Sequence, residues 1–312
     1  RRMMIRVIDS VLELDIRSMI TGDVRRDEPM NHHTSFGVGG RADLFLVPGN
    51  RDELVRVVDF LETRSVPYIP VGRCTNLVVR DGGYRGAVIS LESLNNVECI
   101  SAASGETIIR AEAGVHLRGL LDITQRESLA GLEFLAGIPG SLGGALRMNA
   151  GAWGVEMKDV VLFLFLFITG QGVVDIPRSR LVFSYRNLEL PEDSIITGAE
   201  LSVVPGEAKE VAGKIKAYMS RRHERHPLEY RSAGSVFKNP AGMTAGRLID
   251  EAGLKGLTVG DAMVSELHGN FIVNRGEASA SDILALVEAV RKGVGELKGI
   301  NLETEIVVIG ED

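Results

Sequence analysis

Alternation of hydrophobic and polar positions along the chain predicts a mixture of helices and strands. Near the N-terminus, apolar residues recur at the three- and four-residue spacing of an amphipathic helix, at Ile5, Ile8, Leu12, Ile16 and Met19. The segment that follows, 23–30, is polar, and we expect it to be a linker.

A strand, a helix and a second strand are expected next, and together they form an α/β unit. The strands are predicted at 42–47 and 66–71, and Asn50 is the expected N-cap of the intervening helix. A loop containing glycine begins directly after the second strand, at Gly72, and the unit closes near Asp81.

Strands dominate the middle of the chain and helices dominate the last third. The predicted strands lie at 87–90, 108–113, 160–168, 173–176 and 195–203. Gln171 and Gly172 are the expected turn of a hairpin between two of them, and a short helix is expected at 117–125. Further helices are predicted at 207–226, 244–252 and 281–297, and further strands at 270–273 and 303–309.

Composition narrows the class of protein. A chain of 312 residues suits two or three domains, and a net charge of −7 argues against nucleic acid or an anionic membrane as the main partner. The most apolar run, 160–168, is too short to cross a bilayer, and acidic residues interrupt any signal-peptide core near the N-terminus. Only Cys74 and Cys99 are present, which indicates a reducing compartment. We therefore expect a soluble cytoplasmic protein.

Glycine is concentrated in places where the backbone is expected to turn sharply or to approach a ligand closely. The chain has 36 glycines, and seven of them fall between Gly131 and Gly154. The stretch from Gly137 to Gly144 contains a proline among four glycines, so it is a shaped loop, and a helix starting at Ala145 would direct its free N–H groups back into it. With the loop at Gly72, this pattern suggests one extended ligand between two subdomains, although a tight connection in a β-rich core fits the composition equally well.

Two other patterns are discounted. Residues 37–42 match G-x-G-x-x-A, but no strand leads into them and a strand rather than a helix follows, so they are not a Rossmann motif. His223 and His226 are one helical turn apart without metalloprotease spacing, so a solvated helix end is preferred and no metal site is expected.

Seven motifs, in the expected order from residue 31 to residue 310, resemble those of UDP-N-acetylenolpyruvoylglucosamine reductases. The opening motif is Asn31 to Gly40, and Gly131 to Gly151 is similar to the central flavin-binding motif. The remaining five lie at Phe183–Arg186, Ala233–Pro240, Ala245–Gly256, His268–Asn274 and Leu302–Glu305. The short interval between Arg186 and Ser235 resembles the shorter subclass, which lacks an extra substrate-covering loop.

The resemblance implies an α+β chain with a two-subdomain FAD-binding fold of the vanillyl-alcohol-oxidase type and a C-terminal α/β substrate domain. It implies an N-terminal helix and first FAD-binding subdomain at 1–86, and a second subdomain at 87–206. A substrate-binding domain at 207–300 and a C-terminal strand carrying Glu305 at 301–312 follow. It also implies a flavin-dependent oxidoreductase of peptidoglycan precursor synthesis, a pathway on which cell-wall biogenesis, cell shape and cell division depend. Non-covalent FAD, NADPH as hydride donor and a UDP-sugar substrate are implied, with no obligate protein partner.

The implied reaction is reduction of UDP-N-acetylglucosamine enolpyruvate to UDP-N-acetylmuramate. Hydride addition to the enolpyruvyl double bond leaves an enolate, which needs a stabilising cation and a proton donor. By motif, Arg186 is the stabiliser, assisted by Glu305, and Ser235 is the proton donor. The resemblance assigns substrate binding to Tyr185, Lys238, Asn239 and Asn270. It assigns FAD binding to Gly72, Arg73, Cys74, Thr75, Asn76, Leu77, Gly137, Ile138, Pro139, Gly140, Ser141, Gly143, Gly144, Asn149, Ala150 and Gly151.

Two departures from the family and two alternative functions are relevant here. Cys74 stands where relatives usually carry glycine, so the first flavin loop is expected to be reshaped. His226 stands where glutamine or another polar residue is common. One alternative is another flavin oxidoreductase acting on a small hydroxy acid or alcohol, which oxygen consumption with such substrates would support. The other is a non-catalytic flavin or nucleotide-sugar binding protein, which an absence of NADPH turnover would support.

Overall fold

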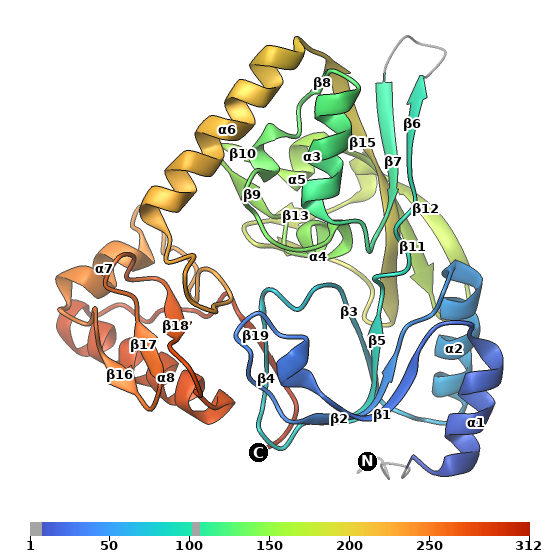
Figure 1. The fold of residues 1–312 in the computed structure, drawn as a ribbon, viewed down its shortest axis with the longest axis horizontal. Helices are drawn as coiled ribbons and strands as arrows, with labels where there is room; N and C mark the ends of the chain where they lie inside the picture. Colours follow the sequence, from blue (N-terminus) through green and yellow to red (C-terminus); the bar gives the residue numbers. More distant parts are fainter. Residues whose placement is uncertain (1–7, 102–106) are drawn as a thin grey trace. The chain divides into compact units, whose positions relative to one another are not determined.

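The computed structural model describes residues 8–101 and 107–312, which fold into two compact units that interleave along the chain (Figure 1). Unit 1 comprises the described residues up to Arg25, Leu44–Arg73 and Gly86–Arg221. Unit 2 comprises Arg26–Asp43, Cys74–Arg85 and Arg222–Asp312. Each unit contains its own cluster of buried hydrophobic side chains, so each is described by itself.

The main sheet of unit 1 has six strands, which pair in antiparallel fashion. Their order is β12 (Gly172–Pro177), β11 (Val161–Ile168), β15 (Ser194–Pro205), β7 (Thr107–Glu112) and β6 (Val97–Ser101), with β8 (Leu129–Ala130) also paired to β15 (Figure 1). The predicted hairpin is confirmed, because Ile168 pairs with Gly172 across the turn. Strand β11 lies between β12 and β15, and most of its apolar side chains are buried, whereas Phe163 is exposed.

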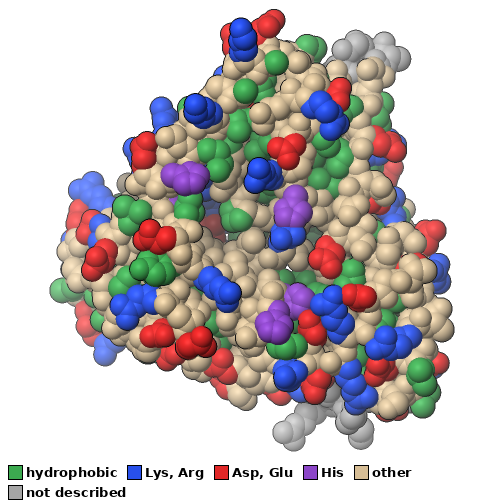
Figure 2. Space-filling view, viewed as in Figure 1, with side chains coloured by type: hydrophobic (Ala, Val, Ile, Leu, Met, Phe, Trp, Pro, Cys, Tyr) green, Lys and Arg blue, Asp and Glu red, His purple; other side chains and the backbone are tan. Residues whose placement is uncertain are grey.

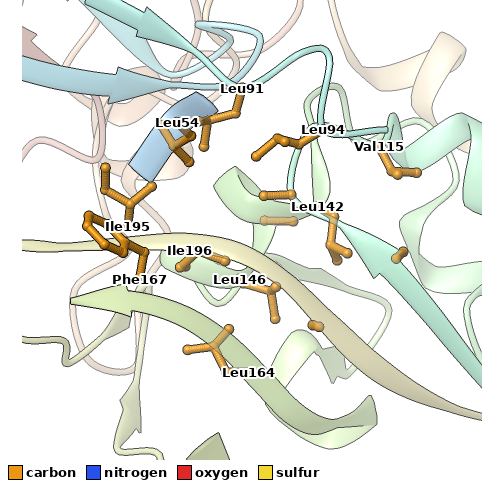
Figure 3. Close-up of a cluster of buried hydrophobic side chains, with 14 of the residues drawn as sticks. Leu54, Leu91, Leu94, Val115, Leu142, Leu146, Leu164, Phe167, Ile195 and Ile196 are labelled. Atoms are coloured by element: carbon orange, nitrogen blue, oxygen red, sulfur yellow. The ribbon is translucent and has the colours of Figure 1, made fainter. Parts of the chain in front are cut away.

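Helices of unit 1 pack their apolar faces into one core. These are α1 (Ser10–Met19), α2 (Arg51–Thr63), α3 (Leu117–Arg126), α4 (Leu142–Arg147), α5 (Met157–Val160) and α6 (Ala208–Arg225). Figure 3 shows Leu142 and Leu146 of α4 among side chains from α2, β11 and β15. Since both leucines are fully buried, α4 and the glycine-rich loop before it are anchored by the core.

The N-terminal part of the chain matches the predicted elements with one correction. Helix α1 is present, while Ile5 lies outside the described residues. Asn50 caps α2 as expected, since its Oδ1 accepts a hydrogen bond from the Glu53 N–H at 3.0 Å. The expected linker at 23–30 is wrong, because Val24–Pro29 forms strand β1. Only Val24 of this strand is buried, and the residues after it are mostly polar. The sequence therefore lacks the alternation of apolar and polar residues that predicts a strand.

A four-stranded sheet has the order β1, β2 (Arg41–Leu46), β5 (Tyr84–Ser90) and β3 (Tyr68–Val71). Strands β3 and β5 are parallel, as in a unit whose strands are joined by a crossover connection. Strands β1, β2 and β5 each begin in the residue range of one unit and end in that of the other.

Unit 2 is built around the long helix α8 (Ala280–Lys298) and the shorter helix α7 (Ala245–Glu251). Its three-stranded antiparallel sheet has the order β16 (Thr258–Val259), β17 (Ala262–Val264) and β18 (Ile272–Asn274). Strands β4 (Leu77–Val79) and β19 (Val307–Ile309) form a parallel pair. The strand predicted at 303–309 is therefore too long, and Glu305 lies before it rather than in it.

The N-terminus of α8 is closed by the carboxylate of Asp81. Its two oxygens accept hydrogen bonds from the N–H groups of Ala280 and Ser281, at 2.9 and 2.8 Å, and from the Ser281 hydroxyl at 2.6 Å. Burial opposes ionisation of Asp81, but these hydrogen bonds outweigh burial and lower its pKa. A negative charge is thereby fixed at the positive end of the helix dipole.

Acidic and basic side chains are interspersed over the face shown in Figure 2. Charged side chains form ion pairs within each unit, such as Arg85 with Asp43 at 2.7 Å in unit 2 and Arg110 with Glu200 at 2.6 Å in unit 1. Among the described residues, no helix is both long enough and apolar enough to cross a membrane.

Candidate active site

The two glycine-containing loops predicted to hold a flavin approach each other within unit 1. A side chain at Gly72 would place its Cβ 2.2 Å from the Ser141 Oγ, so the loops can come this close only because Gly72 has no side chain. Gly140 adopts a φ of 130°, which is open to glycine and strained for other residues. Because these glycines have no side chains, the backbone of the two loops can lie directly against an extended ligand such as FAD.

The helix after the second loop begins three residues earlier than predicted, at Leu142 rather than Ala145. Two of its first N–H groups do not point freely into the loop, because those of Leu142 and Gly143 donate to the carbonyls of Val115 and Ala113 at 2.9 and 2.8 Å. Gly143 is needed for packing, since a Cβ there would lie 2.9 Å from that of Ala113. The expected anion site at free helix N–H groups is therefore not provided by these two residues.

The end of the glycine-rich segment is fixed by the Asn149 side chain. Asn149 is fully buried, with a φ of 42°, and its amide bonds to Glu156, Lys158 and the Ser184 carbonyl. Ala150 donates its N–H to the Ala145 carbonyl at 2.8 Å, which closes the turn after α4.

The first flavin loop continues from Gly72 and Arg73 in unit 1 into Cys74–Leu77 in unit 2. Cys74 is buried with a φ of 48°, a conformation that glycine adopts without steric cost, so the cysteine keeps the backbone shape that glycine favours. The Cys74 carbonyl accepts the N–H of Ser35 at 3.3 Å. The opening motif therefore supports this loop, a role that the sequence did not reveal.

A positive charge lies close to His116 on the flavin-loop side of unit 1. His116 precedes α3 and pairs with Ser141 of the second loop. Partial desolvation, followed by the nearby charge of Arg73, lowers the pKa of His116. This imidazole is therefore neutral near pH 7.

Arg186 is at the tip of a small hairpin in unit 1. Strands β13 (Phe183–Ser184) and β14 (Asn187–Leu188) are antiparallel, and Tyr185 and Arg186 form the two-residue turn between them. Arg186 has a φ of 58°, and its guanidinium carbon lies 5.1 Å from the centroid of the Tyr185 ring. Tyr185 is 43% exposed, so its ring is accessible to a ligand.

Ser235 and Glu305 are brought together in unit 2, whereas Arg186 belongs to unit 1. The N–H of Glu305 donates to the carbonyl of Val236, the residue after Ser235, at 2.7 Å. The Asn76 amide donates to the Glu305 carbonyl at 3.0 Å, and the Asn76 carbonyl accepts the Val307 N–H at 2.9 Å. One unit therefore holds the predicted proton donor Ser235, the residue Glu305 that is predicted to assist Arg186, and a residue of the first flavin loop.

The predicted substrate-binding residues of unit 2 surround this segment. Asn270 is buried, and its amide bonds to both the N–H and the carbonyl of Phe237, at 2.9 and 2.8 Å. Lys238 is joined to Glu303 through its backbone N–H at 2.8 Å and its Nζ at 3.4 Å. The Asn239 side chain accepts the Ala245 N–H at the start of α7, at 2.9 Å. These contacts order the segment after Ser235, and substrate binding by these residues stays a prediction.

An aromatic cluster beside Ser235 was not predicted. The rings of His226, His268 and Phe271 lie with centroids 4.9–5.5 Å apart, and Phe271 pairs with Ser235 across a β-bridge. Burial, followed by the charge of Arg222, the His268 ring and the charge of Arg225, lowers the pKa of His226 to about 4. Its helical spacing from His223 had suggested only a solvated helix end. Within the described part of the chain, no group of three or more potential metal ligands is found.

Comparison with known proteins decides the family. Residues 226–309 match the family model described as the C-terminal domain of UDP-N-acetylenolpyruvoylglucosamine reductase. The chain is 45% identical over 304 residues to the UDP-N-acetylenolpyruvoylglucosamine reductase of Syntrophus aciditrophicus, with 97% of each chain covered. The chain belongs to the UDP-N-acetylenolpyruvoylglucosamine reductase family.

Other members of the reductase family support the assignment. The reductase of Caldanaerobacter subterraneus is 43% identical over 291 residues, covering 93% of this chain and 95% of its own. The crystal structure of the reductase from Thermus caldophilus aligns with a TM-score of 0.75 at 36% identity, covering 92% of this chain and 98% of the other.

The predicted fold class is confirmed. Residues 42–174 match an FAD-binding domain model, and the C-terminal domain of the reductase family follows it along the chain. The flavin-dependent oxidoreductase class and FAD as the cofactor are confirmed with it.

Proposed function

We propose that this protein reduces UDP-N-acetylglucosamine enolpyruvate to UDP-N-acetylmuramate, with NADPH as the hydride donor, in peptidoglycan precursor synthesis. The proposal rests on the proximity of the Ser235 and Glu305 segments in unit 2. The Glu305 N–H donates to the carbonyl of Val236, the residue after Ser235, at 2.7 Å. Family membership over almost the whole chain supplies the identity of the substrate.

Residues of the two loops, which approach each other at Gly72 and Ser141, are proposed to hold FAD. The bound flavin would supply the hydride-transfer chemistry between NADPH and the enolpyruvyl double bond. Hydride addition places negative charge on the carbon next to the substrate carboxylate and on the carboxylate itself. The protein must stabilise that charge and then remove it by protonation.

Arg186 is proposed to stabilise the developing enolate, because its planar guanidinium can meet a carboxylate with two parallel hydrogen bonds. The Ser235 hydroxyl is proposed to donate its proton to the carbanionic carbon. Glu305 is half-buried with its backbone fixed on both sides, which suits a carboxylate that hydrogen-bonds to the reacting group. Tyr185, Lys238, Asn239 and Asn270 are proposed to bind the UDP-sugar.

The cytoplasm is the proposed location, since the activated sugar and NADPH are both cytoplasmic metabolites. The proposed division of the chain stays at 1–86, 87–206, 207–300 and 301–312. The family model for the C-terminal domain, at 226–309, falls within the last two of these segments.

The test separates the two half-reactions of Ser235→Ala. The variant should retain FAD and be reduced by NADPH without the UDP-sugar, but single-turnover reoxidation by the enolpyruvyl substrate should slow by about 10²–10⁴-fold. Ser232→Ala, three residues earlier in the same segment, is the matched control. Ser235→Cys should restore part of the rate, since a thiol can also donate a proton. Reoxidation of Ser235→Ala within about threefold of the parent, against the expected loss, would remove Ser235 from the reaction.

A further inference from the structure

The hairpin that carries Arg186 is too small to hold its own shape. It contains only two residue pairs, Phe183 with Leu188 and Ser184 with Asn187. Isolated hairpins of two strands are marginally stable even when much longer. Arg186 also adopts a φ of 58°, which is unfavourable for a residue with a side chain. The orientation of Arg186 must therefore be fixed by contacts from outside the hairpin.

One such contact comes from Asn149, which bonds to the residue before the turn. Its Nδ2 donates to the carbonyl of Ser184 at 3.1 Å and to Oε2 of Glu156 at 3.0 Å, and its Oδ1 accepts the N–H of Lys158 at 3.0 Å. Both amide hydrogens and one acceptor position are used, so the amide has a single favourable orientation. Because Asn149 is fully buried, losing one of these bonds would leave a polar group unsatisfied.

A second contact comes from Arg147, which bonds to the two residues after the turn. Its Nη1 donates to the Asn187 Oδ1 at 2.8 Å and to the Leu188 carbonyl at 2.5 Å. Asn187 and Leu188 directly follow Arg186, whereas Ser184 precedes the turn. The turn is therefore held at both ends, by Arg147, the last residue of α4, and by Asn149 two residues later.

The same short segment follows the second flavin loop and is anchored in the core. Helix α4 starts immediately after Ser141, and its Leu142 and Leu146 are fully buried (Figure 3). Arg147 is itself exposed, so its contribution is not that of a core residue. It joins a helix packed in the core to the two residues after Arg186.

We infer that Arg147 is a positioning residue for Arg186, acting with Asn149 to fix the Arg186 turn to the helix that follows the flavin loop. The inference rests on the proposed role of Arg186 in stabilising the enolate. Arg147 does not contact the reacting atoms in this assignment; it acts through the hairpin. Its effect is confined to the half-reaction that needs Arg186, which is reoxidation by the enolpyruvyl substrate.

The experiment measures both half-reactions of the FAD-loaded enzyme for Arg147→Met, which keeps the aliphatic stem and removes the donors. We expect flavin content and the rate of reduction by NADPH within twofold of the parent, and reoxidation slowed by about 10- to 100-fold, the loss expected from a slightly misplaced catalytic group. Arg147→Lys retains one donor group and should recover part of the rate. Arg126→Met is the control, since Arg126 also ends a helix of unit 1 and its guanidinium pairs with the neighbouring Glu127.

A double-mutant comparison separates this inference from the proposed function. If Arg147 acts through Arg186, Arg147→Met should slow reoxidation much less in an Arg186→Lys background than in the parent. A normal reoxidation rate in Arg147→Met, together with a slow rate in Arg186→Lys, overturns the positioning role alone. A normal rate in Arg186→Lys overturns the assigned role of Arg186 and the inference with it. Equal slowing of both half-reactions, or loss of flavin in Arg147→Met and Arg147→Lys alike, makes Arg147 a structural residue and also overturns the inference.

Discussion

Arg186 combines an unfavourable backbone conformation with an exposed aromatic neighbour, and neither feature benefits stability. Strain of this kind persists where the surrounding structure holds it and is concentrated at functional sites. The Arg186→Lys variant keeps the charge but loses the planar fork that can meet a carboxylate. We expect reoxidation by the enolpyruvyl substrate to fall by about 10- to 100-fold, with FAD binding and reduction by NADPH unchanged.

Stopped-flow absorbance of the flavin band checks this prediction. Arg180→Lys is the matched control, because Arg180 is an exposed arginine in the short helix η3 (Arg178–Arg180) just before the hairpin. Near-normal reoxidation of Arg186→Lys would show that Arg186 serves only the structure.

His226 makes stability depend on pH. Burial, then Arg222, His268 and Arg225, lower its pKa to about 4 in the folded protein, whereas an unfolded histidine titrates near about 6.5. Between these values the unfolded chain binds the additional proton, so the stabilisation is fully present above pH 6.5 and is lost as the pH falls toward 4.

Replacing His226 by glutamine, a polar residue that does not titrate, removes this titration. The apparent melting temperature of His226→Gln should therefore decline less than that of the parent between pH 6.5 and 4.5. His223→Gln, exposed one turn earlier on α6, is the control and should follow the parent. Parallel curves for the parent and His226→Gln would contradict the prediction.

At the scale of elements, the sequence predicted those with a strong apolar pattern and missed those held by distant partners. Helix α8 and strand β11 were predicted to within one residue at each end and strand β15 to within two, because each buries a run of apolar residues. Strand β1 was missed because its residues are mostly exposed. Strand β4 has three buried residues, too few to give a period, and it pairs with β19 more than 200 residues later.

In the candidate site too, residues within local motifs were predicted, whereas a residue that acts through distant contacts was missed. Ordered motifs predicted Arg186, Ser235 and Glu305 as site residues, but no local pattern pointed to Arg147, whose proposed positioning role depends on contacts with Asn187 and Leu188. Contacts between segments 40 residues apart are set by tertiary packing. Such contacts can be recognised only when the positions of the hairpin and of α4 in the structure are known.

Helix α8 depends at its N-terminus on an acidic residue from a distant part of the sequence. Asp81 accepts three hydrogen bonds from Ala280 and Ser281, in addition to the capping box between Ser279 and Asp282. Asp81→Ala should lower the free energy of unfolding by about 1–2 kcal/mol, the usual loss for a cap combined with a helix-dipole charge.

Urea unfolding followed by circular dichroism measures this loss. Glu296→Ala is the control, since it removes an exposed carboxylate near the opposite end of the same helix, where a negative charge opposes the dipole. It should be neutral or slightly stabilising. A change in Asp81→Ala no larger than in Glu296→Ala would show that Asp81 does not stabilise the helix.

At the scale of the whole molecule, the purified protein should be yellow and should release its flavin intact on denaturation. Shaped loops around glycines, rather than a reactive side chain, are proposed to hold FAD, and Cys99 has its pKa raised first by burial and then by Glu127, which disfavours the reactive thiolate. After heat or acid treatment and ultrafiltration, the flavin should be in the filtrate. Flavin retained by the polypeptide would contradict this, and Cys74→Ser would then identify the attachment point.

Unit 2 is assembled from stretches of chain that the ribosome produces far apart in time. Phe36, Val38 and Val78 emerge early, yet their core partners lie beyond residue 230, on α7, α8 and the segments around them. At typical elongation rates of roughly 5–20 residues per second, these early apolar side chains wait on the order of ten seconds or longer for their partners. Until those partners are synthesised, these apolar side chains lack their native core contacts, and exposed apolar surface of this kind favours aggregation of the nascent chain.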